Sequence, residues 1–555
     1  MNSRKAAEPQ RVRVLNFIPQ FRNVWIFNSR ENNMLKIIKI GAISLITILL
    51  VAIAGFFFLQ STWVKPEFRT PKEAFLHGSI GTELMPLPVF QILPDLFPDK
   101  FQPAGKEAGD WIQQFGFIRG KPNENEGLPV GFNTSNYQPQ SGSPSPTKFV
   151  GFSCVLCHSS HIRRFEGDEE IVVTGMGSTS LDLFAWVDAV KSSLLDDKRL
   201  TLTNIAQAYE SKYDKQLGIL EKATIAFWLS TARREVAASL PKWDNPYTGK
   251  DLRNPHLEPN GPGRTQPFRE LVRFVMDRPG ASDRSFSKLP SLYEQKNREW
   301  VQYDGSVRDR LSRSVLAAIA AGANPNNLLV PEISHNAVQA IEYTLDLKGP
   351  KYTEVFKDIK LDPQKVERGR AVYMQNCSTC HGYRNSKDDS WIKGEVQGLI
   401  TPIAEIQTDS ERLNYRYYQE LPDAVETYFP EDHPLKPKRE NLRPGPMGDT
   451  KGFINAPLES VFARAPYLHN GSVLTLAELI NLKPRREIFY RGDNLYDPID
   501  VGLASPTEPN EKTYYKLDTH ALGNSNKGHD YPWPYQGAGW DKAALEDLLE
   551  YLKTL

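Results

Sequence analysis

The same five-residue pattern, Cys-x-x-Cys-His, occurs twice in the chain, at Cys154–His158 and at Cys377–His381. These two runs contain all four cysteines of the 555 residues. In such a run each thiolate can bond to a vinyl carbon of haem, and the adjacent histidine supplies an axial nitrogen to the iron. We therefore predict two covalently bound haem c groups with iron. The residues that would hold them are Cys154, Cys157 and His158 for the first, and Cys377, Cys380 and His381 for the second.

Three other uses of paired cysteines fit the sequence less well. Four cysteines are too few to staple a chain of 555 residues as a disulfide scaffold. Zinc sites usually place their two cysteine pairs tens of residues apart, whereas more than two hundred positions separate the pairs here. A thioredoxin-like redox pair does not require the histidine that follows both pairs.

The composition indicates a folded chain without a nucleic-acid partner. Apolar residues make up 40% and aromatic residues 11%, which is enough to fill real cores. The 67 basic and 67 acidic side chains give a net charge of zero, and the sequence has no basic block and no nucleic-acid motif. The length suggests two or three domains.

Residues 40–59 form an uninterrupted apolar run without charge. About 20 residues of helix cross the roughly 30 Å hydrocarbon core of a bilayer. Eight basic residues and only two acidic ones precede the run, so the positive-inside rule leaves the N-terminus in the cytoplasm. We therefore predict a cytoplasmic segment 1–39, a single transmembrane anchor 40–59 in the inner membrane, and haem domains in the periplasm.

A cleaved signal peptide is the alternative for this segment. Met34 would then be the true start, and Ala52-Ile53-Ala54 resembles a small-residue cleavage site. Cleavage there would leave Phe56, Phe57 and Phe58 beside the new terminus, and the apolar run is longer than a usual signal-peptide core. We therefore favour the uncleaved anchor.

The rest of the chain is divided into a linker, 60–72, a first haem domain, 73–348, and a second one, 349–555. A helical pattern over 366–373 leads into the second motif, and leucines from Leu545 to Leu555 form an amphipathic stripe. We predict a mainly α fold with two cytochrome c-like haem domains, long loop insertions and one preceding transmembrane helix. Residues 147–153 are typical of extended chain, so the first domain would be a modified version of this fold.

Several further segments, in this order around the two motifs, resemble the bacterial di-haem cytochrome c peroxidase superfamily. The resemblance is strongest to a long subfamily that includes rubber oxygenases and di-haem fatty-acid dioxygenases. Some relatives carry a calcium ion between their domains, and the resemblance leaves such a calcium open as a further cofactor. The segments that carry the resemblance are 78–83, 93–97, 128–132, 408–412, 464–472 and 524–529.

The resemblance also bears on the sixth ligand of the second iron. Standard peroxidases take a methionine that follows a Pro-Tyr-x-His-x-Gly segment, but residues 473–482 contain no methionine. Met447 is the nearest alternative, and His529 is the better candidate by similarity to the oxygenase-like subfamily. Two imidazoles would make the second haem an electron-transfer centre and leave the first as the reactive one. We expect His469 near the second haem and His161 at the surface or facing a propionate.

The residues around the turn Asp304-Gly305 bear on the reaction. Peroxidase chemistry needs a distal base, usually His, Glu or Gln. By resemblance the segment after this turn lies on the distal side of the first haem, yet residues 316–323 are apolar and contain no such base. An apolar wall favours the binding of dioxygen beside a hydrocarbon substrate over the cleavage of peroxide. The alternative is that this segment is simply a buried helix. Trp300 or Tyr303, before the turn, would relay an electron between the haems or be ordinary core aromatics. Relatives carry His-Trp where this chain has Gln302-Tyr303.

These expectations combine into a membrane-anchored, periplasmic di-haem oxidoreductase similar to cytochrome c peroxidases, with His158, Trp300 and Tyr303 as catalytic residues. It would act on peroxide or dioxygen and exchange electrons with a protein such as a small cytochrome or a cupredoxin. One alternative is a dioxygenase of an unsaturated lipid or polyisoprenoid. The other is a non-enzymatic electron carrier with both irons six-coordinate.

Overall fold

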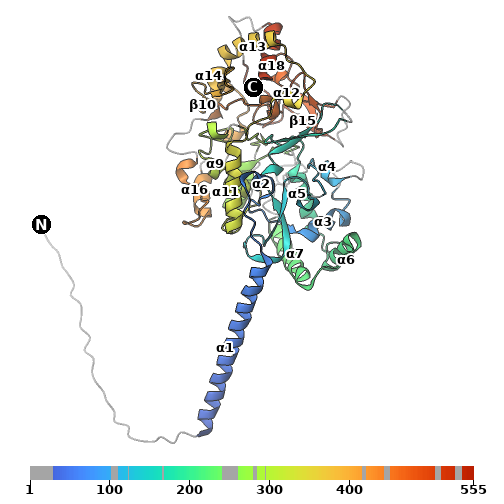
Figure 1. Cartoon of the computed structure of the whole chain (residues 1–555), viewed down its shortest axis with the longest axis vertical. Coiled ribbons are helices and arrows are strands. Elements are labelled where there is room, and N and C mark those ends of the chain that lie inside the picture. Colours follow the sequence, from blue (N-terminus) through green and yellow to red (C-terminus); the bar gives the residue numbers. More distant parts are fainter. Residues whose placement is uncertain are drawn as a thin grey trace, which may run out of the picture. The chain divides into compact units, whose positions relative to one another are not determined.

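The chain divides by its internal contacts into two units, Met1–Thr62 and Trp63–Leu555. The computed structural model is shown in Figure 1. Helix α1 (Ser29–Trp63) accounts for the described part of the first unit. The structure describes residues 29–101, 110–122, 124–165, 168–239, 260–278, 284–293, 295–415, 420–442, 451–506, 514–531 and 541–555.

Helix α1 contains the predicted anchor, residues 40–59, and continues N-terminally through the charged residues Lys36 and Lys39. Among the residues described, no helix is both long and apolar enough to cross a membrane. The predicted transmembrane helix over 40–59 and the single-pass inner-membrane localisation are therefore wrong. The periplasmic placement of the haem domains and the membrane contact through the N-terminal helix rested on this helix and lose their support.

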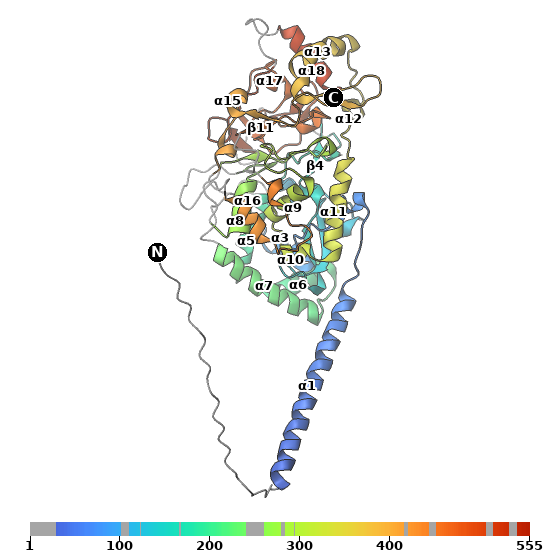
Figure 2. The same ribbon diagram turned by 90° about the vertical axis from the view of Figure 1, so that its left-hand side faces the viewer.

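An antiparallel three-stranded sheet forms the centre of the part that carries the first motif. Strands β1 (Met85–Pro86), β2 (Phe132–Tyr137) and β3 (Pro144–Phe152) lie in the order β1-β3-β2. The last residues of β3 are buried, and the strand leads directly into Cys154, so the predicted extended chain over 147–153 is confirmed. Helices α3 (Leu87–Leu96) and α7 (Ile219–Ser239) pack against this sheet, and α5 (Leu183–Leu194) and α6 (Leu202–Tyr213) pack against α7. Figure 2 shows these four helices in the same part of the molecule.

Aromatic side chains fill the core beside this sheet. The ring of Trp186 lies edge-on to Phe117, Phe132 and Phe152, with ring centres 5.5–6.1 Å apart. Edge-to-face contacts at this distance contribute stability beyond the area they bury. This cluster holds β3, and with it the start of the first motif, in a fixed position.

A second layer consists of helices α8 (Pro267–Met276), α9 (Arg310–Ala320), α11 (Pro331–Leu345) and α16 (Leu421–Tyr428), which share one apolar core. Helix α2 (Pro71–His77) packs against α11. The predicted linker 60–72 therefore ends in a helix that begins at Pro71. Short helices complete this part at α4 (Trp111–Gln114) and α10 (Pro325–Leu328).

Two helices flank the second motif. Helix α13 (Pro363–Asn376) leads into α14 (Ser378–His381), and the C-terminal helix α18 (Lys542–Leu552) packs along α13. A side chain at Gly369 would place its Cβ 1.9 Å from the carbonyl oxygen of Asp547, so this glycine allows the two helices to approach closely. Both helical patterns predicted here are confirmed.

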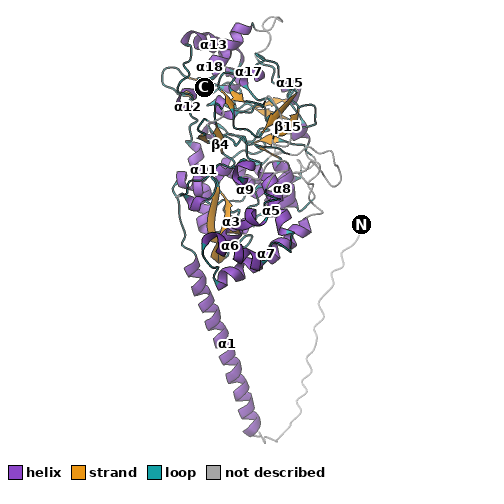
Figure 3. Ribbon diagram, turned by 90° about the vertical axis from the view of Figure 1, so that its right-hand side faces the viewer, coloured by secondary structure: helices purple, strands orange, loops and turns teal. Residues whose placement is uncertain are grey.

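Short strands accompany the helices from β1 to β15, as Figure 3 shows. The predicted mainly α fold is therefore wrong. Apart from β2 and β3, the strands are two to four residues long, too short for alternation to distinguish them in a sequence. The remaining pairs are β4 (Ser159–Ile162) with β5 (Ile171–Thr174), β6 (Arg264–Thr265) with β7 (Ser287–Lys288), β8 (Tyr383–Arg384) with β9 (Trp391–Ile392), β10 (Ile400–Pro402) with β11 (Gly452–Ile454), β12 (Ile488–Arg491) with β15 (Tyr515–Asp518), and β13 (Tyr496–Asp497) with β14 (Gly502–Leu503). The short helices of the same region are α12 (Tyr352–Val355), α15 (Ile403–Ile406) and α17 (Leu476–Leu479).

The segment after the first motif is bonded to a segment far along the chain. The backbone N–H of Arg163 donates to Asn494 at 3.0 Å, and that of Tyr496 donates to Arg163 at 2.8 Å. The guanidinium of Arg163 also pairs with Asp493 at 3.0 Å. Residues 63–555 accordingly form one compact unit, and the predicted boundary between 348 and 349 stays a prediction.

Candidate functional site

The first motif follows β3 without a break. Residues 154–156 form a single 3₁₀ turn, and the Nδ1–H of His158 donates to the carbonyl oxygen of Pro290 at 2.9 Å. This bond fixes the ring and leaves Nε2 as the nitrogen available to a metal. Burial and the nearby positive charge of Arg313 lower the pKa of His158 to about 3, so the imidazole is neutral, as an iron ligand must be.

The second motif has the same arrangement. Its histidine closes α14, and the Nδ1–H of His381 donates to the carbonyl oxygen of Ala456 at 2.6 Å. Burial lowers the pKa of this imidazole. Burial also raises the pKa of the Cys377 thiol to about 12. The two predicted proximal histidines are thus oriented in the same way, each by one backbone carbonyl.

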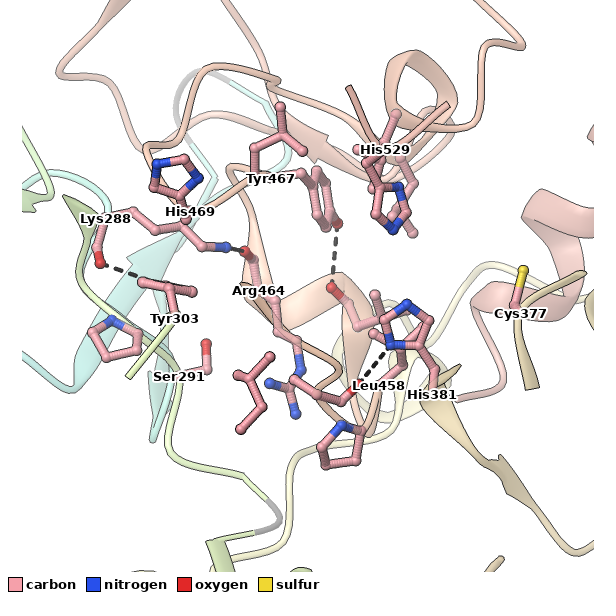
Figure 4. A pocket seen from close by; sticks show the side chains of 18 of the residues that line it. Lys288, Ser291, Tyr303, Cys377, His381, Leu458, Arg464, Tyr467, His469 and His529 are labelled. Carbon is pink, nitrogen blue, oxygen red and sulfur yellow. Dashed lines mark hydrogen bonds between the residues drawn. The ribbon is translucent and has the colours of Figure 1, made fainter. Parts of the chain in front are cut away.

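His529 faces His381 across a cavity (Figure 4). The two ring centres lie 6.1 Å apart, with 46° between the ring planes. A ligating ring nitrogen lies about 2 Å from its metal, so two imidazoles on opposite sides of one iron have ring centres about 6 Å apart. Burial is the main reason that the pKa of His529 falls to about 3. The donor set and its spacing therefore fit a haem iron between His381 and His529, with Cys377 and Cys380 as the attachment points.

The cavity between these histidines has a volume of about 250 Å³. One part of its wall is apolar, and another part is positively charged. Such a wall suits a flat apolar macrocycle that carries carboxylates. The apolar part includes Val461, Leu476, Leu479, Ile480, Leu548 and Leu552, and the charged part is formed by Lys288, Arg298, Arg313 and Arg464.

The charged part includes residues that the sequence did not single out. Arg313 lies on the buried face of α9, where its charge acts on both Cys154 and His158. Burial raises the pKa of Cys154 to about 11 against the opposing effect of Arg313. The Lys288 ammonium donates to the carbonyl oxygens of Arg464 and Pro466, and burial lowers its pKa to about 7. In the sequence Arg313 stands three positions before the apolar stretch 316–323, and this neighbourhood was its only signal.

Tyr303 lines the same cavity, whereas Trp300 is buried and is not among the lining residues. The Tyr303 hydroxyl lies 3.5 Å from the carbonyl oxygen of Lys288. The ring of Tyr303 lies 6.4 Å from that of His469, which stacks on Phe453 at 4.3 Å. Tyr303, Lys288 and His469 lie together on the side of Figure 4 away from His381 and His529.

Positions were also predicted for His161, His469 and Met447. His161 is 4% exposed, and its ring bonds to Glu170 at 2.7 Å and to Ser180 at 3.0 Å, so it does not lie at the surface. Its strand, β4, turns it inward. The alternative, that it faces a propionate, stays a prediction. His469 lines the same cavity as His381 but lies with Tyr303 and Lys288 on the side away from it, and its predicted place near the second haem stays a prediction. Met447 lies outside the described residues.

No group of three or more His, Cys, Asp or Glu side chains among the described residues could hold a metal ion. A calcium ion liganded by backbone carbonyls would not form such a group. The calcium between the domains therefore stays a prediction.

Residues 452–490 match a family described as RoxA-like, cytochrome c-like. The chain is also similar to two proteins of Sinorhizobium fredii. It is 27% identical over 303 residues to the uncharacterized protein y4iM, covering 49% of this chain and 65% of that protein. It is 23% identical over 574 residues to the uncharacterized protein y4iJ, covering 89% of this chain and 93% of that protein. The chain thus spans less than two thirds of y4iM and nearly all of y4iJ.

The matched stretch 452–490 contains β11, the carbonyl that orients His381, and several residues of the cavity wall. The family match supports a cytochrome c-like, haem-containing oxidoreductase with haem c and its iron as the cofactor. Enzyme activity is plausible on the same ground.

Proposed function

We propose that the chain is a di-haem c-type oxidoreductase similar to cytochrome c peroxidases, with a reactive haem at the first motif and an electron-transfer haem at the second. The observation that carries this proposal is the 6.1 Å spacing of the His381 and His529 ring centres. Two imidazoles at this spacing would both hold a haem iron at the second site and would keep peroxide or dioxygen away from it. In this proposal His158 would hold the iron at the first site, and the reacting molecule would bind there.

Bound haem supplies the one-electron and oxygen chemistry. The protein orients the histidines that would hold the two haems and shields the two sites. The carbonyls of Pro290 and Ala456 hold the rings of His158 and His381 in one orientation. Arg313 carries a positive charge beside the first motif, where it can hold a propionate or another anion. In this proposal Tyr303 is the aromatic residue through which an electron passes between the two sites.

A dioxygenase of an unsaturated lipid or polyisoprenoid is the second candidate. The match of residues 452–490 to a RoxA-like family favours it, together with the resemblance to rubber oxygenases. The buried face of α9, with Val315, Leu316 and Ile319, also lacks a carboxylate or histidine that would serve as a distal base. An electron-transfer protein such as a small cytochrome or a cupredoxin is the proposed partner in the peroxidase reaction.

The test uses the full haem-loaded chain. Carbon monoxide should bind to one of two reduced irons, and electron paramagnetic resonance should show one low-spin centre with two imidazole ligands. Two low-spin centres that bind neither carbon monoxide nor cyanide would instead identify a non-enzymatic electron carrier. Peroxide turnover with a reduced cytochrome supports the peroxidase, whereas oxygen uptake on linoleate or polyisoprene without peroxide consumption supports the dioxygenase.

A further inference from the structure

Tyr303 contacts the segment that orients the first histidine. Its hydroxyl lies 3.5 Å from the carbonyl oxygen of Lys288. Two residues further along the chain, the carbonyl oxygen of Pro290 accepts the Nδ1–H of His158. The side chain of Tyr303 therefore lies against the short backbone segment that fixes the first motif's histidine.

Tyr303 also contacts the segment that orients the second histidine. Its carbonyl oxygen accepts the backbone N–H of Ile454 at 2.8 Å. Two residues further along, the carbonyl oxygen of Ala456 accepts the Nδ1–H of His381. Tyr303 is thus in contact with both orienting segments, through its side chain on one side and its backbone on the other.

The turn that carries Tyr303 has an unfavourable backbone conformation. Gln302 has a φ of 66°, which is unfavourable for a residue with a side chain, and Gly305 has a φ of 62°. The turn is closed at its base by a bond from the N–H of Val301 to the carbonyl of Val307 at 2.7 Å. A turn of this kind keeps one conformation only where its surroundings fix it.

A buried ion pair fixes this turn. Asp304, the residue after Tyr303, accepts from Arg412 at 2.9 Å, and the two side chains are 0% and 1% exposed. The guanidinium of Arg412 also donates to Ser287 at 2.5 Å and lies 6.0 Å from the ring centre of Tyr303. It lies 4.7 Å from the ring centre of Phe268 on another side. Arg412 therefore contacts the turn, the strand beside it and the tyrosine ring at once.

We infer that Arg412 is a positioning residue, which holds Tyr303 between the two haem sites through its ion pair with Asp304. This inference rests on the proposed function, because it assigns Arg412 to the proposed electron route. One electron leaves the second site, which is oxidised, and reaches the first site, which is reduced, and no bond forms or breaks. Arg412 touches neither motif and acts through Tyr303.

The experiment measures electron transfer between the two sites in the full haem-loaded chain. In the half-reduced protein, carbon monoxide bound at the first site keeps the electron there. A light flash removes the carbon monoxide, and the return of the electron to the second site, which is the same step in reverse, is followed by absorbance. Arg412→Gln should slow the transfer about tenfold, since small misplacements of a reacting group have effects of this size or larger. The absorption spectra and both reduction potentials should stay as in the wild type. Asp304→Asn should reproduce the slower transfer and serves if Arg412→Gln does not fold.

The control is Arg368→Gln, which removes a more exposed ion pair. Arg368 pairs with Asp547 at 2.5 Å between α13 and α18, and neither residue lines the cavity. Loss of this ion pair should leave the transfer rate unchanged. An equal slowing in the control would mean that loss of any ion pair slows transfer, and would overturn the inference.

A double variant separates positioning from other effects. In a Tyr303→Leu background, Arg412→Gln should cause no further slowing, because residues that act as one unit are not additive. The same fold-loss in both backgrounds would overturn the positioning role. If Tyr303→Leu slows transfer and Arg412→Gln does not, the inference fails and the proposed route stands. If Tyr303→Leu itself leaves the rate unchanged, the proposed route fails as well.

Discussion

The imidazole rings of His381 and His529 face each other with their centres 6.1 Å apart, although 148 positions separate them in the sequence. His529 follows Gly528 and has a φ of 53°, and its backbone N–H donates to the carbonyl of Ile406 at 2.8 Å. The left-handed backbone of two successive residues turns the loop so that the imidazole points into the cavity. Its position is therefore set by the loop backbone as well as by its side chain.

Replacing His529 by alanine should change the spectrum of one haem only. The second iron loses one axial nitrogen, so its low-spin signal should convert to a high-spin one while the first haem keeps its signal. Electron paramagnetic resonance and absorption spectroscopy of the oxidised protein measure this. His520→Ala is the control, because its side chain is 64% exposed. An unchanged spectrum in His529→Ala would exclude His529 as a ligand.

Replacing Cys154 and Cys157 together by alanine should remove one covalently bound haem. The wild type should carry two haems per chain and the double variant one, because each pair of thiols holds its own group. Mass spectrometry of the denatured chain and the pyridine haemochrome assay count the haems. The same double change at Cys377 and Cys380 should leave one haem with the spectrum of the first site. Two haems in either variant would contradict the assignment of the motifs.

Glu83→Gln should remove a pH dependence of stability. Glu83 is 5% exposed and accepts hydrogen bonds from Ser79, Ser135 and Asn327, and burial raises its pKa above the usual 4.5. The folded chain then binds this proton more tightly than the unfolded chain. The contribution of Glu83 to the free energy of unfolding is complete below pH 4.5 and is lost as the pH rises through the folded pKa. The free energy of unfolding then falls by at most about 1.4 kcal/mol per pH unit. Urea unfolding at several pH values between 4 and 8 measures the difference from wild type.

The control for this change is Glu73→Gln. Glu73 caps α2 through Thr70, and these hydrogen bonds lower its pKa. Its contribution to stability is therefore present above the unfolded pKa and is lost as the pH falls. The two variants should change the pH profile in opposite directions. The same direction in both would contradict the assignment for Glu83.

Gly369→Ala should destabilise the packing of α13 against α18. Alanine favours a helix over glycine by about 1 kcal/mol, but here its Cβ would lie 1.9 Å from the carbonyl oxygen of Asp547. We expect a net loss of about 2 kcal/mol, because overpacking a tight contact costs more than the helix gains. Thermal unfolding measures this loss of stability. At the exposed position of the same helix, Ala371→Gly should cost about 1 kcal/mol, the ordinary helix effect.

The sequence predicted the features that depend on neighbouring residues. The two motifs, the extended chain before Cys154 and the helices beside Cys377 are local patterns, and the structure has them where they were expected. His529 lies 148 positions from His381, so only resemblance to relatives pointed to it. Strands of two to four residues give no periodic pattern, which is why the fold was predicted as mainly α.

The positions of single charged residues were not predictable in the same way. Arg313, Lys288 and Arg412 look like ordinary surface residues in the sequence, and each is buried by partners more than a hundred positions away or on other elements. An arginine is buried only where its guanidinium contacts a carboxylate, a carbonyl or an aromatic face. Such contacts form in the tertiary structure and cannot be found from neighbouring residues in the sequence. The 40–59 run was predicted as a membrane span from its length and lack of charge alone.

The bond between Arg163 and Asp493 joins residues 330 positions apart. A ribosome makes the first motif long before it makes residues 493–496, so the segment after the motif lacks this partner for most of synthesis. Folds that depend on such distant contacts form slowly. These bonds to Arg163 therefore form only after the ribosome has reached about the last ninth of the chain. A chain cut between the two motifs would lack this partner permanently.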